Sequence, residues 1–211
     1  MYINMLKKEY MMDDVNDKWE KFLNPDEIKP YLLFCSLFLT SYEILKGIII
    51  DRPIVFFSDW SDLPDPIKVS DYEENVLSLD EKQRPLQASI NWHQQNNIID
   101  ADDIQIFNRI TKYRNTIAHR LLKHCVDNPI DDIGHIFNDI VNLIYKIEKW
   151  WIINYELEIN PIENVEEIDY DKILPGAIIT IQILVDIALG EKEESEHYYK
   201  KYIETFKKNK K

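Results

Sequence analysis

The spacing of apolar residues along the chain is the feature that most constrains its fold. In residues 26–50, 104–123 and 131–151, aliphatic and aromatic side chains recur at steps of three and four, which places them on one face of an α-helix. Only 4 of the 211 residues are Gly, too few for the many tight turns of a β-rich protein. The sequence therefore predicts an all-α protein, built as an up-down helical bundle.

Turn-forming and acidic residues mark where the helices begin and end. The first expected helix begins at Pro25 and stops at Asp51-Arg52-Pro53, and the second begins at Ser78. The expected helices of the bundle cover about 26–50, 78–96, 100–123 and 131–159. Residues 51–79 combine three Pro with several aromatic residues, which favours an irregular insertion, with or without a short strand, over a long helix.

The remaining residues, about 160–211, are expected to form a C-terminal helical extension. An acidic linker leads to Pro175-Gly176, an apolar helix to Leu189 and a charged helix over about 191–207. We expect a single domain over residues 1–211, with its core in about 26–158. The two most apolar runs, 31–50 and 173–189, are expected to be core helices rather than membrane spans, because each contains charged residues that are costly in lipid.

The cysteines and the first residues bear on the compartment. Cys35 and Cys125 are the only two cysteines, so the sequence has neither a disulfide framework nor a Cys-x2-Cys metal motif. Residues 1–18 are charged and lack the apolar core of a signal peptide. A cytoplasmic protein without a membrane span is the expectation.

Charge is distributed unevenly along the chain. The net charge is −13, and a strongly acidic protein does not attract nucleic acid through its overall field. Residues Ile104–His124 contain five basic and no acidic residues, which leaves 20 basic and 38 acidic residues, or −18, elsewhere. The five basic residues are Arg109, Lys112, Arg114, Arg120 and Lys123. This segment is either a local patch for RNA or a basic helix docked on an acidic neighbour.

A short motif lies inside this basic segment. Arg114-Asn115-x3-His119 resembles the signature of the HEPN superfamily, Arg-Asn-x3-His, and the strict form would arise by chance only about 0.01 times in such a chain. Its position in a mid-chain helix is also similar to that in HEPN bundles. Ser41–Lys46 resembles a less specific Tyr-Glu-x2-Lys-type stretch of the same family. The resemblance covers about residues 26–158.

The resemblance implies a metal-independent endoribonuclease of the toxin or phage-defence type, with no cofactor. Imidazole titrates near neutrality, so His119 can serve as general acid or base, and the guanidinium of Arg114 can stabilise a phosphorane-like transition state. Asn115 would orient the site, while Arg109, Lys112, Arg120 and Lys123 would guide the RNA backbone. In HEPN ribonucleases the motifs of two subunits meet, so the resemblance implies a homodimer with a composite site.

The helix geometry limits how these side chains cooperate. Arg114 and His119 are five positions apart, or about 140° around the helix, so they share a face only loosely. Asn115 and His119 are four positions apart and stack on one face. Asn115 is therefore expected to hold either the imidazole or the helix end in place.

A second interpretation does not involve catalysis. The acidic composition and the extension suit a HEPN-like helical scaffold that binds a protein or a nucleotide, with His119 a surface histidine and Arg114 part of a structural ion pair. An antitoxin protein is a partner in keeping with the resemblance. One toxin class carries Tyr two residues after the His, as a site of AMP addition; here that residue is Leu121, so this regulation is not expected.

Overall fold

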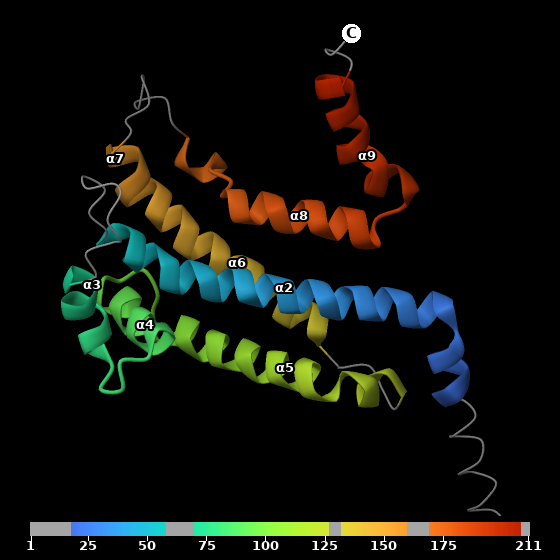
Figure 1. Cartoon of the computed structure of the whole chain (residues 1–211), viewed down its shortest axis with the longest axis horizontal. Helices are drawn as coiled ribbons and strands as arrows, with labels where there is room; N and C mark the ends of the chain where they lie inside the picture. The colour runs from blue at the N-terminus through green and yellow to red at the C-terminus, as the bar shows by residue number, and fades with distance from the viewer. Residues whose placement is uncertain (1–17, 58–69, 127–131, 160–168, 208–211) are drawn as a thin grey trace, which may run out of the picture. The chain divides into compact units, whose positions relative to one another are not determined.

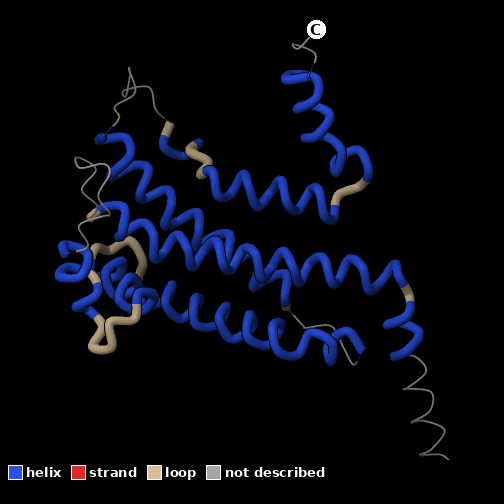
Figure 2. The backbone as a smooth tube through the Cα atoms, in the orientation of Figure 1, coloured by secondary structure: helices blue, strands red, loops and turns tan. Residues whose placement is uncertain are grey.

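The computed structural model describes residues 18–57, 70–126, 132–159 and 169–207 (Figure 1). Helices make up 88% of these residues, which contain no strand (Figure 2). The predicted all-α helical bundle is therefore confirmed. Its longer helices are α2 (Pro25–Phe56), α4 (Pro85–Gln95), α5 (Ala101–Val126), α6 (Ile133–Trp151), α8 (Gly176–Leu189) and α9 (Lys192–Tyr202). Shorter ones are α3 (Ser70–Asn75), η1 (Leu77–Leu79), η2 (Ile152–Glu156), α7 (Leu157–Ile159), η4 (Tyr170–Lys172) and η5 (Ile203–Lys207).

The chain divides into two compact units that alternate along the sequence. Of the described residues, unit 1 contains 18–39, 113–126, 132–133 and 183–207, and unit 2 contains 40–57, 70–112, 134–159 and 169–182. Helices α2, α5 and α8 each contribute residues to both units.

Unit 2 contains an aromatic cluster that joins α2, α4, α6 and η2. The rings of Trp92 and Trp151 stack with centroids 5.7 Å apart and an interplanar angle of 13°. Phe56 packs against both indoles and against Tyr155, with centroids 5.2–5.9 Å apart. Aromatic pairs at these separations add to the stabilisation from burial itself. The cluster therefore fixes the end of α2 against α4 and α6.

Helix α2 continues past the residues expected to end it. It runs through Pro53 to Phe56, so the predicted stop near Ile50 was wrong. A proline within a helix removes one backbone hydrogen bond, and tertiary contacts offset this cost. Arg52 binds Glu148 and Glu156 at 2.6–2.7 Å, and Phe56 enters the aromatic cluster. Of the predicted insertion, residues 58–69 lie outside the described part, whereas α3 and η1 occupy most of 70–79.

The second predicted helix begins later than expected. Ser78 was taken as its start, but η1 and a turn precede α4, which begins at Pro85. Asp80 accepts hydrogen bonds from the backbone N–H and the side chain of Arg84, so it closes a turn instead of opening a helix. The predicted end near Asn96 is confirmed, because α4 ends at Gln95.

The start of α5 follows the expectation. The carboxylate of Asp100 accepts the backbone N–H groups of Asp102 and Asp103 at 2.9 Å, which satisfies donors left open at a helix N-terminus. Asp103 accepts the N–H of Asp100 in return, at 2.8 Å. Lys146 of α6 forms ion pairs with both carboxylates. These contacts anchor the first turn of α5 to α6 within unit 2.

Helix α8 is not the core helix that its composition predicted. By length and composition, Pro25–Phe56 and Tyr170–Leu189 both pass as candidate membrane spans, and 39% of the apolar window of the first but only 11% of the second is buried. Within α8, Ile181 alone is buried. Helix α2 contributes Phe38, Leu45 and Ile49 to the buried core, as expected of a core helix.

Candidate functional site

All seven residues predicted for the RNA site lie on α5. Arg109 and Lys112 belong to unit 2, and the Arg-Asn-x3-His motif belongs to unit 1. The side chain of Arg114 is half-buried, while Asn115 and His119 are exposed. The two polar side chains with the most direct chemical use, a guanidinium and an imidazole, are therefore both available on one helix.

Arg114 and Asn115 are connected by a hydrogen bond. Nη1 of Arg114 donates to Oδ1 of Asn115 at 3.4 Å, near the upper limit for such a bond. Among the described residues no hydrogen bond joins Asn115 to His119. In this structure the amide thus orients the guanidinium of Arg114 and leaves the imidazole unheld.

A break in α5 follows the motif directly. Arg120 has φ −131° and ψ 15°, outside the helical region, so α5 is kinked one residue after His119. Kinks of this kind usually occur at Pro or Gly, and residues 114–126 contain neither. No feature of the sequence indicated this break. Its effect is to make His119 the last residue of the straight part of α5.

The predicted RNA-guiding residues fall into two groups. Arg109 donates to Oδ2 of Asp139 on α6 at 2.7 Å, as in the alternative in which a basic helix docks on an acidic neighbour. Arg120 and Lys123 are exposed, and no described residue forms an ion pair with either. Lys112 is exposed as well. The cationic surface of α5 is therefore strongest at and beyond the motif, not before it.

Neither cysteine has the properties of a nucleophile. Burial raises the pKa of the Cys35 thiol and, to a smaller degree of enclosure, that of Cys125. A thiol acts as a nucleophile only as thiolate, which a raised pKa disfavours at neutral pH. Cysteine chemistry is therefore not a feature of this unit.

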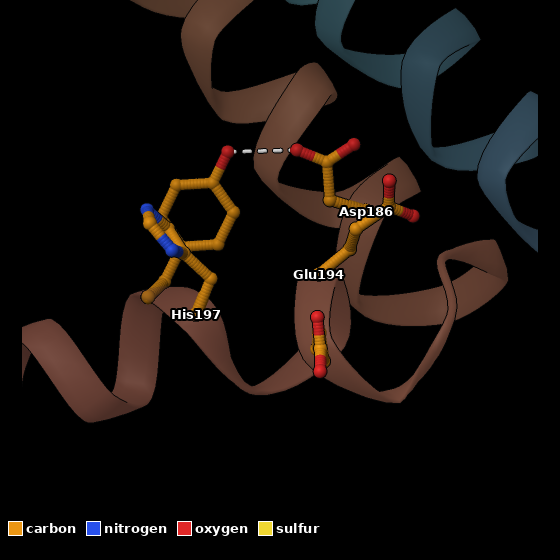
Figure 3. Close-up of a pocket in the computed structure, with 5 residues that line it drawn as sticks. Asp186, Glu194 and His197 are labelled. Carbon is orange, nitrogen blue, oxygen red and sulfur yellow. Dashed lines mark hydrogen bonds between the residues drawn. The ribbon is translucent and has the colours of Figure 1, made fainter.

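A small acidic hollow lies between α8 and α9 in unit 1. It is lined by Asp186, Glu193, Glu194, His197 and Tyr198 (Figure 3). The phenol of Tyr198 donates to Oδ2 of Asp186 at 2.7 Å, and the Glu191–Glu194 capping box closes the start of α9. Within the described ranges, no three His, Cys, Asp or Glu side chains are grouped so as to hold a metal ion. The hollow is accounted for by the packing of α9 on α8.

In comparisons with known proteins, no family model, no curated protein and no solved structure matches the chain. The fold defines the class of the protein, an all-α helical bundle. The residues that bear on its function lie on α5 and α9.

Proposed function

We propose that the protein is a metal-independent endoribonuclease of the HEPN type, acting in toxin or phage-defence systems. The observation that carries the proposal is the strict Arg114-Asn115-x3-His119 motif on α5, with an exposed imidazole and a guanidinium oriented by its neighbour. The exposed cations Arg120 and Lys123 follow the motif and supply local positive charge in an acidic chain.

The proposed reaction needs only the RNA and these side chains. A 2′-hydroxyl attacks the adjacent phosphorus, and an imidazole takes its proton. The bond from phosphorus to the 5′-oxygen breaks, and a second imidazole, in its protonated form, gives a proton to that oxygen. The products are a 2′,3′-cyclic phosphate and a free 5′-hydroxyl. Arg114 would stabilise the charge on the equatorial oxygens in the transition state.

One chain supplies a single motif histidine, and the reaction uses an acid and a base. The proposal therefore includes a homodimer in which two α5 helices meet and two copies of Arg114 and His119 form a composite site. The straight part of α5 ends at His119, which leaves the imidazole open to a second copy. Cytoplasmic residence without a membrane span, and an antitoxin partner, belong to the same proposal.

Cleavage of a labelled RNA in EDTA tests the proposal. Wild type should produce 2′,3′-cyclic phosphate ends, and His119→Ala should abolish them. His135→Ala is the matched control, since His135 is an exposed histidine on α6 outside the motif. RNA left intact by a large excess of folded wild-type protein, across several buffers and RNA sequences, would refute the ribonuclease.

The second candidate function is a non-catalytic helical scaffold for a protein or nucleotide. The ion pair between Arg109 and Asp139 favours it, because one cation of the basic helix serves packing within unit 2. The scaffold predicts that Arg114→Ala and His119→Ala retain full biological activity. Loss of that activity in both folded variants, with activity kept in His135→Ala, separates the ribonuclease from the scaffold.

A further inference from the structure

A second basic segment balances the one on α5. Residues 198–211 contain six Lys and one Glu, so their net charge is +5 in a chain of −13. Without this segment and Ile104–His124, the chain has 14 basic and 37 acidic residues, or −23. Surplus positive charge is therefore confined to two short stretches, and only one of them contains the motif.

The second half of α9 presents aromatic rings beside its lysines. Tyr199 is 65% exposed and Tyr202 is 54% exposed, and a spacing of three residues puts both on one side of the helix. The neighbouring Tyr198 differs, because its phenol is bound to Asp186 of α8 (Figure 3). Tyr198 thus fixes α9 to α8, whereas the rings of Tyr199 and Tyr202 face solvent over more than half of their area.

The lysines between these rings are available to an anion. Lys201 is exposed and forms no ion pair within the described residues. Lys200 pairs with Glu196 at 2.8 Å, with both side chains exposed, and such surface pairs contribute only about 0–1 kcal/mol. A phosphate can therefore compete for Lys200 at little cost.

We propose that the Tyr199–Tyr202 face of α9 and the lysines beside it bind single-stranded RNA. Bases stack on exposed aromatic rings without regard to sequence, and nearby lysines neutralise the phosphates. The inference rests on the proposed function for its choice of RNA among polyanions. It assigns α9 the task of holding the strand, to which Arg120 and Lys123 of α5 contribute only near the motif.

The helix dipole and a membrane surface each account for less of this segment. Lysines near a helix C-terminus stabilise the helix dipole, which explains their position but not the exposed tyrosines. A helix that lies on a membrane needs an apolar face of Leu, Phe or Trp, and Lys192–Tyr202 contains no aliphatic residue, Phe or Trp. Charge and exposed rings together favour a nucleic-acid strand.

Fluorescence anisotropy with a labelled oligouridine, in the His119→Ala background, separates binding from cleavage. Tyr199→Ala with Tyr202→Ala should raise the Kd at least about tenfold, and the paired Phe variants should keep it within about twofold. Lys200→Gln and Lys201→Gln should each lower the slope of log K against log salt by about 0.7. Tyr170→Ala, at an exposed tyrosine on η4, is the matched control.

The outcomes distinguish the two proposals. Unchanged RNA affinity in the tyrosine variants overturns this inference, as does loss of phosphatidylserine vesicle binding in those variants with RNA binding intact. Cleavage by wild type with tyrosine-independent RNA binding removes only the role of α9. Tyrosine-dependent binding by a wild type that never cleaves removes only the ribonuclease.

Discussion

The indole N–H of Trp151 points to Nε2 of His93 at 3.5 Å, while Nδ1 of the same imidazole lies 2.7 Å from the carbonyl oxygen of Ser89. The carbonyl can only accept, so Nδ1 carries the proton and Nε2 is the acceptor. His93 is fully buried, and burial lowers its pKa to about 4. The folded protein therefore holds this imidazole neutral.

Stability should fall when the pH drops below the pKa of an unfolded histidine. Between about pH 6.5 and pH 4 the unfolded chain binds a proton at His93 that the folded chain excludes, so the unfolded state gains stability as the pH falls. From pH 7 to pH 5 this amounts to about 2 kcal/mol. Urea unfolding followed by circular dichroism at both pH values, in wild type and His93→Gln, measures it as the difference between the two pH dependences. Parallel dependences would contradict the neutral, buried imidazole.

Ser89→Ala should stabilise the protein. The hydroxyl of Ser89 is buried and forms no hydrogen bond within the described residues, so the native state carries its desolvation cost. Removing the oxygen should raise the free energy of unfolding by up to about 1 kcal/mol, helped by the higher helix propensity of Ala. Ser78→Ala is the control, since that hydroxyl donates to the Glu74 carbonyl at 2.6 Å and is solvent-exposed. Equal destabilisation in both variants would show that Ser89 has a partner.

Arg52→Met should be among the most destabilising single changes in unit 2. Arg52 donates to both carboxylate oxygens of Glu148, which is only 6% exposed, so the substitution leaves a buried charge without its partner. A loss of about 3 kcal/mol in the free energy of unfolding is expected. Arg52→Met with Glu148→Leu should recover most of that loss, because no charge is then buried. Lys46→Ala, which removes an exposed pair with Glu43, should cost less than about 0.5 kcal/mol.

The cations of α5 should differ in their effect on RNA binding. Arg109→Gln should leave the salt slope unchanged, because Arg109 is paired with Asp139, and should cost less than about 1 kcal/mol in stability. Arg120→Gln and Lys123→Gln should each reduce the slope by about 0.7, as expected for cations that contact phosphates. Binding titrations at four salt concentrations in the His119→Ala background measure all three. A larger change in slope for Arg109→Gln than for the other two would place the strand before the motif.

Periodicity predicted the long helices of this fold because each repeats its apolar spacing over several turns. Helices α5, α6 and α9 begin and end close to the expected positions. The errors are where tertiary contacts override local signals. Arg52 and Phe56 hold α2 together beyond Pro53, and Arg84 recruits Asp80 into a turn. Such contacts join residues up to 104 positions apart and have no local signature.

The candidate site was predictable in its residue types but not in its pairing. The motif identified Arg114, Asn115 and His119 from spacing alone, and their roles stay predictions. The partner of Arg109 and the kink at Arg120 depend on how α5 packs, which no pattern in the sequence encodes. The tyrosines of α9 gave a usable signal, an aromatic pair three residues apart among lysines, which the charge of the helix obscured.

The aromatic cluster of unit 2 has an optical consequence. Trp92, Trp150 and Trp151 all lie in that unit, and Trp19 is the one tryptophan among the described residues of unit 1. Intrinsic emission will therefore report mainly on the α4–α6 packing around His93. The motif and the tyrosines of α9 sit where this signal is nearly blind, so a single tryptophan introduced at Leu122, which is 70% exposed, would give the catalytic end its own fluorophore.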